Sequence, residues 1–313
     1  MRKSNFLVML GALACAVLVS SCNVNDDIED ANDGAVRFTS SIGQQATPGG
    51  SPVTKAAGTS WTGGDAIGIF MVDHTSGDVV MSAANKQYTT TGGSTFTAVA
   101  GNEIYYPQTG KVDFIAYYPW KTGYTLGTAI DVEIATTQTA VNQPEFDLLW
   151  TKANNSGTGY DKVTHETTPV ALMFGHKLAK LVMNCKGDPS VGTLPANMAV
   201  SITGMNTKNT FDLATGALGT AGTKAAIAPL KIATAATFDA SYEAIIMPGA
   251  YADGDVKVIF TVNGDDFTWN VPATAFAGGA EHTYTITITR TGVQFTGTIE
   301  PWAPGTGGPG TAE

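Results

Sequence analysis

Histidine and cysteine are the side chains of this sequence best able to bind a metal ion, and their spacing does not favour such a site. His74, His165, His176 and His282 lie far apart in the chain, and none has the close His, Cys or carboxylate neighbours that a zinc site requires. In an extended segment His176 shares one face with Phe174 and Leu178. We therefore expect His176 to lie beside the core with a hydrogen-bond partner, and we expect no metal site.

Motifs for covalent or cofactor chemistry are equally absent from the sequence. It contains no G-x-S-x-G nucleophile elbow, no phosphate-binding loop and no dinucleotide-binding fingerprint at the start of a helical segment. Cys185 ends an apolar stretch, where we expect a buried and unreactive thiol. The acidic pairs at 253–255 and 265–266 are more typical of hairpin turns than of calcium loops. We expect a protein that is not an enzyme and that uses no cofactor.

Cys22 carries the clearest chemical signal in the chain. Arg2 and Lys3 precede an apolar stretch from Phe6 to Val19, and the chain then continues Ser20-Ser21-Cys22. This order is typical of a secretory signal, residues 1–21, that is removed on export and is too short to span a bilayer. The small-small-Cys ending resembles the bacterial lipobox, so we expect Cys22 to be lipidated and to anchor the precursor in the outer membrane. The alternative is an ordinary signal peptide cut nearby, with Cys22 incidental.

The composition limits the partners of the mature chain. The 313 residues include 17 Lys and Arg against 27 Asp and Glu, for a formal net charge of −10. Because no basic cluster is present, phosphate contacts lack their electrostatic basis and nucleic acid is excluded as a partner. The acidic run Asn25–Asp30 follows Cys22, and residues 22–34 are predicted to form a lipidated tether, with a solvated linker as the plainer interpretation.

Period-two alternation of apolar and polar residues dominates the rest of the sequence. Val256, Val258, Phe260 and Val262 share one face, and a similar alternation follows Thr283. Dipeptides such as Asn263-Gly264 supply the turns between such segments. The pattern predicts an all-β fold of two sandwich domains, residues 35–165 and 166–304, with a boundary near residue 165 and a flexible tail over 305–313.

A near-repeat links the two ends of the mature chain. The segments Val36–Ile42 and Val293–Ile299 both fit V-x-F-T-x-x-I. In strand geometry Val36, Phe38 and Ile42 project to one face, as do the corresponding residues of the second copy, Val293, Phe295 and Ile299. The two segments would therefore fill the same row of pockets, although two short strands can also be similar by chance.

A Gly-, Pro-, Ser- and Thr-rich segment, Gly43–Gly58, follows the first copy and contains one basic residue, Lys55. Such a loop is an accessible site for a Lys/Arg-directed protease. Cutting at Lys55, or at Arg37 as the second candidate, would release the first strand together with the lipid anchor. The groove left behind would need a replacement strand, which the C-terminal copy of another subunit can supply.

The chain resembles the fimbrillins of the Bacteroidetes, lipoprotein-derived subunits of type V pili. The resemblance runs over most of the mature chain and is carried by five segments in a fixed order: Ser60–Phe70, Ile104–Pro107 with Asp113–Pro119, Asp147–Leu149, Phe174–Lys180 and Gly297–Trp302. It implies two transthyretin-like β-sandwich domains in tandem and polymerisation by protease-assisted donor-strand exchange. Residues 36–42 would then be the displaced strand, residues 293–299 the donor strand and Lys55 the cut position. Family members often carry Arg there, so Lys55 puts an Arg-specific protease in doubt.

The function implied by this resemblance is that of an adhesive pilus subunit at the cell surface. Its partners would be other pilin subunits, a maturing protease and, before maturation, the outer membrane. The alternative is a surface-anchored lipoprotein that binds glycans or host ligands through aromatic rings such as Tyr105, Tyr117 and Trp120 and does not polymerise.

Overall fold

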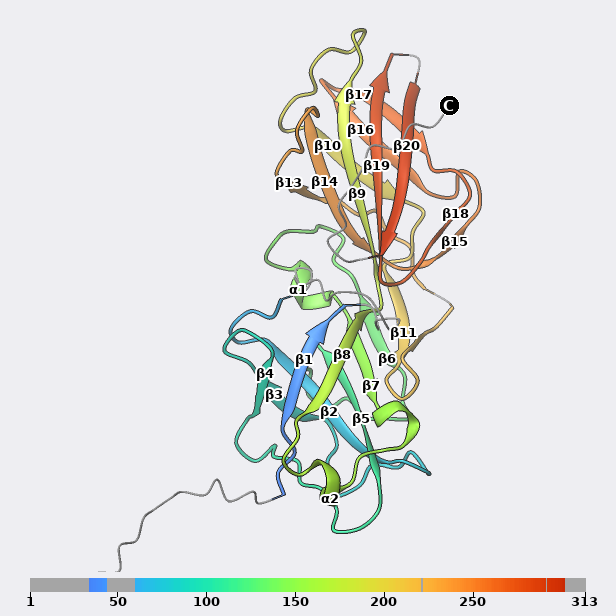
Figure 1. Ribbon diagram of the computed structural model, residues 1–313. Coiled ribbons are helices and arrows are strands. Elements are labelled where there is room, and N and C mark those ends of the chain that lie inside the picture. The colour runs from blue at the N-terminus through green and yellow to red at the C-terminus, as the bar shows by residue number, and fades with distance from the viewer. Residues whose placement is uncertain (1–33, 44–59, 221, 291, 302–313) are drawn as a thin grey trace, which may run out of the picture. The chain divides into compact units, whose positions relative to one another are not determined.

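The computed structural model describes residues 34–43, 60–220, 222–290 and 292–301, and all of them belong to one compact unit. Their regular secondary structure is almost entirely β-strand, with three short helices, which confirms the predicted all-β fold (Figure 1). The predicted signal segment 1–21, Cys22, nearly all of the tether, Lys55 and the tail 305–313 lie outside the described residues.

Seven strands of the first part of the chain close into a barrel in the order β1-β4-β3-β2-β5-β7-β8. Three short helices lie between the later strands: α1 (Gln143–Phe146), the 3-10 helix η1 (Asn155–Gly157) and α2 (Lys162–His165). The barrel strands are β1 (Phe38–Ile42), β2 (Ala66–Asp73), β3 (Lys86–Thr89), β4 (Thr95–Ala98), β5 (Val112–Tyr118), β7 (Leu149–Ala153) and β8 (Val170–His176).

The barrel has its own hydrophobic core. Strands β2 and β5 are buried along nearly their whole length, which fits their largely apolar sequences. Aromatic rings meet edge to face in this core: the ring of Phe38 lies 5.1 Å from that of Tyr88 and 5.2 Å from that of Phe114. Trp61 packs similarly against Phe174.

The remaining strands form four smaller sheets. Their orders are β13-β14-β9-β19-β20, β10-β16-β17, β12-β11-β6 and β15-β18. The strands are β6 (Ile130–Glu133), β9 (Ala179–Gly187), β10 (Ala199–Thr203), β11 (Lys208–Asp212), β12 (Ala217–Leu218), β13 (Leu230–Ile232), β14 (Ala240–Ile246), β15 (Gly249–Tyr251), β16 (Lys257–Val262), β17 (Asp265–Asn270), β18 (Thr274–Phe276), β19 (Ala280–Thr289) and β20 (Gly292–Pro301).

Two of these pairings bear on the expected division near residue 165. Strand β8, which that division assigns to the second domain, pairs with β1 and β7 inside the barrel. Strand β6, from the first half of the chain, pairs with β11. The two-domain division with these bounds stays a prediction.

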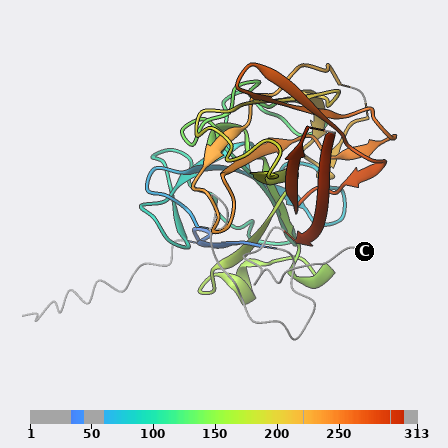
Figure 2. The same ribbon diagram turned by 90° about the horizontal axis from the view of Figure 1, so that it is seen from above.

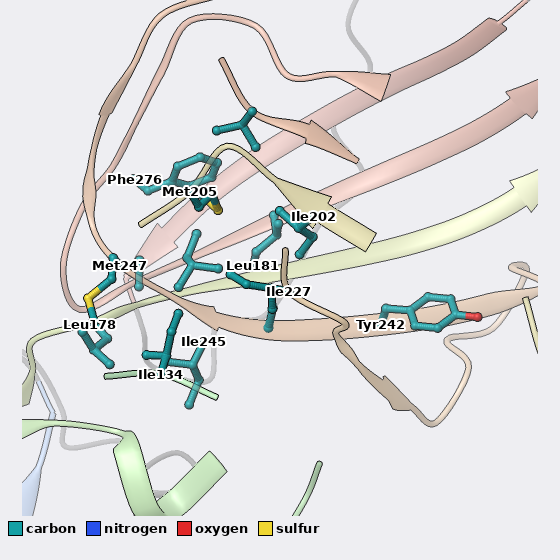
Figure 3. Close-up of a cluster of buried hydrophobic side chains, with 14 of the residues drawn as sticks. Ile134, Leu178, Leu181, Ile202, Met205, Ile227, Tyr242, Ile245, Met247 and Phe276 are labelled. Carbon is teal, nitrogen blue, oxygen red and sulfur yellow. The ribbon is translucent and has the colours of Figure 1, made fainter. Parts of the chain in front are cut away.

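A second hydrophobic cluster is formed mainly by the later strands, with Leu181, Ile202, Ile245 and Phe276 among its buried side chains (Figure 3). It also includes side chains of β2 and β5, such as Phe70 and Ile115. Cys185 is fully buried in this cluster as a free thiol, and burial raises its pKa to about 12. Its predicted burial is confirmed, and at neutral pH the thiol is protonated and unreactive.

The hairpin predicted around Asn263-Gly264 is also confirmed. Strands β16 and β17 pair antiparallel, and the register brings Val262 opposite Asp265. Asn263 and Gly264 both have positive φ, at 53° and 94°, as a two-residue hairpin loop requires.

Candidate functional site

Strand β1 carries the first copy of the near-repeat and is inserted between two other strands of the barrel. It runs antiparallel to β4, with Phe38 opposite Phe96, and parallel to β8, with Phe38 opposite Val170. Figure 1 shows β1 beside β8. Because β1 closes the barrel, its removal would expose the edges of both β4 and β8.

Backbone hydrogen bonds extend beyond both ends of β1. The amide of Val36 donates to the carbonyl of Ile104 over 2.8 Å, and the amide of Gly43 donates to the carbonyl of Phe174 over 2.9 Å. Between these ends, the carbonyl of Arg37 accepts from the amide of Val170. The first copy is therefore held along its whole length.

The side chains of β1 follow the alternation expected from its sequence. Val36, Phe38, Ser40 and Ile42 are buried, whereas Arg37 and Ser41 are exposed. Phe38 is only 1% exposed and Ile42 4%. The three apolar residues predicted for the displaced strand thus form one buried row.

Strand β20 carries the second copy of the near-repeat and lies at the edge of its sheet. It pairs antiparallel with β19 over its full length, from Thr289 opposite Gly292 to Ala280 opposite Pro301. β20 is the deep red strand beside β19 (Figure 2). It has no strand partner on its other side among the described residues.

The apolar row of β20 is far less buried than that of β1. Val293 is half-buried, Phe295 is 39% exposed and Ile299 is 63% exposed. The ring of Phe295 lies 5.1 Å from that of Trp269, so part of the row does contact the core. Transfer of this row into the place of β1 would remove apolar surface from water.

The small residue at the fifth position of each copy has a specific environment. The hydroxyl of Ser40 donates to the carbonyl of Ser94 over 3.2 Å. Gly297 lies under the ring of Tyr284, and a Cβ atom added there would come within 2.5 Å of its Cε1 atom. Tyr284 was not predicted from the sequence, although an aromatic residue on a strand neighbouring one with a central Gly is a recognisable signal.

Of the two candidate cut positions, the structure describes Arg37, whereas Lys55 lies outside the described residues. Arg37 precedes β1, and its Nη2 atom donates to the carbonyl of Thr167 over 2.8 Å. Arg37 therefore belongs to a backbone segment that is paired within the barrel.

The other predicted sites have structural partners. His176 is buried, and its Nδ1 atom lies 2.9 Å from Oδ1 of Asp147, which confirms its predicted position beside the core. Of the aromatic residues proposed to bind glycans, Tyr117 is fully buried and Trp120 half-buried, while Tyr105 is 41% exposed. They do not form a shared exposed surface. Among the described residues, no three His, Cys, Asp or Glu side chains are grouped as metal ligands.

One half-buried cation was not anticipated from the sequence. The ammonium group of Lys177 lies over the rings of Trp150 and Phe211, 5.1 Å and 5.9 Å from their centroids. The indole nitrogen of Trp150 donates to the carbonyl of Leu213 over 2.8 Å, which fixes the ring. Trp150, Lys177 and Phe211 come from distant parts of the sequence, so no local pattern could have indicated this arrangement.

The sequence profile of the fimbrillin-like family matches residues 54–302, most of the chain. The protein therefore belongs to the fimbrillin-like family. A relative from Bacteroides uniformis, named "Putative fimbrium subunit Fim1C", is 32% identical over 315 residues, with 96% of each chain covered.

Solved structures of similar proteins share the fold. A "putative cell adhesion protein" from Bacteroides uniformis matches with a TM-score of 0.67 and 31% identity, covering 87% of this chain and all of that one. Another "putative cell adhesion protein", from Bacteroides ovatus, matches with a TM-score of 0.68 and 23% identity, covering 86% of this chain and 97% of that one. The described part of the chain includes no helix with the length and apolar character needed to cross a membrane.

Proposed function

We propose that this protein is a structural subunit of a cell-surface pilus that supports adhesion. It is exported as an outer-membrane lipoprotein through Cys22, trimmed at Lys55 and polymerised by donor-strand exchange. In this process residues 36–42 leave the barrel and residues 293–299 of another subunit replace them. The names of the similar proteins from Bacteroides uniformis, a fimbrium subunit and a cell adhesion protein, support the assembly and adhesion parts of this proposal.

The observation that carries the proposal is the contrast between β1 and β20. The two strands share one sequence pattern, but the row of β1 is buried between two strands and that of β20 is partly exposed on an edge. Fully burying an exposed apolar side chain contributes about 1.5 to 3 kcal/mol, and Phe295 and Ile299 would each gain the part of this that corresponds to their exposed fraction. The incoming strand also gains backbone hydrogen bonds of about 1 kcal/mol each.

Covalent attachment explains why exchange waits for proteolysis. While β1 is tethered to its own barrel, its effective concentration exceeds that of any free donor strand. Cutting the chain after Ile42 removes this advantage, so a donor from another subunit can then compete. No step of this process requires a catalytic residue or a cofactor of the subunit itself, and we propose that the protein is not an enzyme.

The test is polymer formation by the secreted full-length chain after treatment with a Lys-directed protease. We expect SDS-resistant ladders from the parent and none from Lys55→Gln, from a deletion of residues 292–313, or from Phe295→Asp. Thr298→Asp is the matched control, because Thr298 is exposed and corresponds to the exposed Ser41 of β1. It should polymerise like the parent. Ladders from the deletion variant would overturn the donor assignment.

A further inference from the structure

Strands β7 and β8 separate soon after they meet. The register pairs Leu149 with His176 and Trp150 with Gly175, and no further residue pair joins the two strands. Beyond this point their diverging ends line a groove of about 600 Å³. Gly43, the residue after β1, lies at the same groove. The groove is therefore next to the strand whose replacement is proposed above.

Lys177 supplies a positive charge to this groove and has no negative partner among the described residues. It lines the groove, and its ammonium group lies over the ring of Trp150. None of the ion pairs formed by the described residues includes Lys177. Burial lowers the pKa of Lys177, which reflects the cost of a partly desolvated charge without a counter-ion. A carboxylate beside it would relieve that cost.

A longer side chain at the position of Gly43 could supply such a carboxylate. The parallel register of β1 and β8 ends with Ile42 opposite Phe174, so Gly43 comes next to Gly175. A Cβ atom added to Gly43 would meet no atom within 4 Å. Gly175 has no side chain to block the path, and Lys177 follows two residues later on the same face. Gly43 and Lys177 both line the groove, so a Glu side chain at the position of Gly43 could extend toward Lys177.

The alignment of the two copies of the near-repeat indicates which residue of a donor strand would lie at the position of Gly43. When Val293–Ile299 is superposed on Val36–Ile42, the residue after Ile299, Glu300, takes the position of Gly43. Glu300 is the sole acidic residue in the sequence of β20. We propose that Glu300 of a second copy of this chain forms an ion pair with Lys177 at the groove between β7 and β8.

This inference rests on the proposed donor-strand exchange and gives a reason why the exchanged state is favoured over the precursor. The uncut chain carries Gly43 at this place, and none of its described residues supplies Lys177 with a counter-ion. The exchanged strand supplies the carboxylate, so the ion pair exists only between subunits. It therefore favours the polymer over the precursor, in addition to the burial of apolar side chains.

A charge-swap experiment on full-length protein tests the pair. Lys177→Glu and Glu300→Lys, each alone, should make trimmed ladders dissociate at least about fivefold faster in a mild denaturant, since an ion pair of this kind contributes about 1 kcal/mol. The double variant Lys177→Glu with Glu300→Lys should return to within about twofold of the parent. Lys257→Glu, at an exposed lysine of β16, is the control and should have no effect.

The outcomes separate this inference from the proposed function. A double variant that shows the sum of the two single losses, or single variants that behave as the parent, would overturn the ion pair. If Lys177→Glu lowers the stability of the uncut protein, Lys177→Gln and Glu300→Gln in a double-mutant cycle replace the swap, and additive effects would then refute the pair. Ladders formed by Phe295→Asp would instead refute donor-strand exchange itself.

Discussion

Ile42 and Ile299 hold equivalent positions in two similar strands, but Ile42 is 4% exposed and Ile299 is 63% exposed. The same side chain is thus part of a core in one strand and largely in contact with water in the other. This difference fits the role proposed for each strand, because the free energy of apolar burial scales with the area removed from water. β1 stabilises the uncut subunit, whereas β20 retains apolar surface that another subunit can bury.

The first prediction is an asymmetry between these two isoleucines in the uncut protein. Ile42→Ala leaves a cavity in the barrel and should lower the free energy of unfolding by about 2 to 5 kcal/mol. Ile299→Ala removes a mostly exposed side chain and should change it by less than about 0.5 kcal/mol. Urea denaturation of both variants measures the difference. Equal losses would show that Ile299 is part of the subunit core.

The second prediction concerns Gly297, which lies under the ring of Tyr284 in its own subunit. Gly297→Ser adds a Cβ atom that would lie only 2.5 Å from Cε1 of Tyr284, so β20 should bind its own sheet less tightly. In the proposed exchanged state the same residue would take the place of Ser40, where serine fits. We expect Gly297→Ser to form ladders faster than the parent after trimming.

Gly297→Val is the contrasting variant for this experiment. It also displaces the ring of Tyr284, but its methyl groups exceed the space that Ser40 occupies in the barrel, where Ser40 is 7% exposed. It should therefore form ladders more slowly than Gly297→Ser. If both variants polymerise more slowly than the parent, the pocket of Ser40 is not the one that receives Gly297.

Local patterns in the sequence were sufficient to predict individual strands and turns. The alternation around Phe38, the hairpin at Asn263-Gly264 and the burial of Cys185 depend on neighbouring residues, and each is found in the structure. The parallel pairing of β1 with β8 joins Phe38 to Val170, and no local pattern encodes such a distant contact. The same reason explains why the charge of Lys177 over Trp150 was not foreseen.

The third prediction is a loss of stability in acid caused by His282. This residue is fully buried beside the ring of Phe276, neither ring nitrogen has a hydrogen-bond partner among the described residues, and burial lowers its pKa. The unfolded chain, with a histidine pKa near 6.5, therefore binds a proton more readily than the folded one. The contribution of His282 to stability is complete above about pH 6.5 and falls as the pH drops below that value, by up to about 1.4 kcal/mol per pH unit.

Urea denaturation at pH 7.5 and pH 5.5 measures this effect, with His282→Leu as the control. The variant lacks the titrating group, so its stability should fall less between the two pH values than that of the parent. An identical fall in both proteins would assign the acid sensitivity to other groups.

The last prediction distinguishes the two candidate cut sites. The carbonyl of Arg37 accepts a hydrogen bond from the amide of Val170, and its side chain donates to Thr167, so a protease could bind this segment only after local unfolding of the barrel. The sequence around Lys55 is rich in Gly, Pro, Ser and Thr and lacks the apolar alternation typical of a paired strand.

Brief treatment with a Lys/Arg-directed protease should yield a product that begins at Ala56, as N-terminal sequencing would show. Lys55→Gln should block its formation, whereas Arg37→Gln should leave its rate unchanged within about twofold, because Arg37 is exposed and replaceable. A product that begins at Phe38 would instead place the cut inside the paired segment and would require that β1 leave the barrel before proteolysis rather than after it.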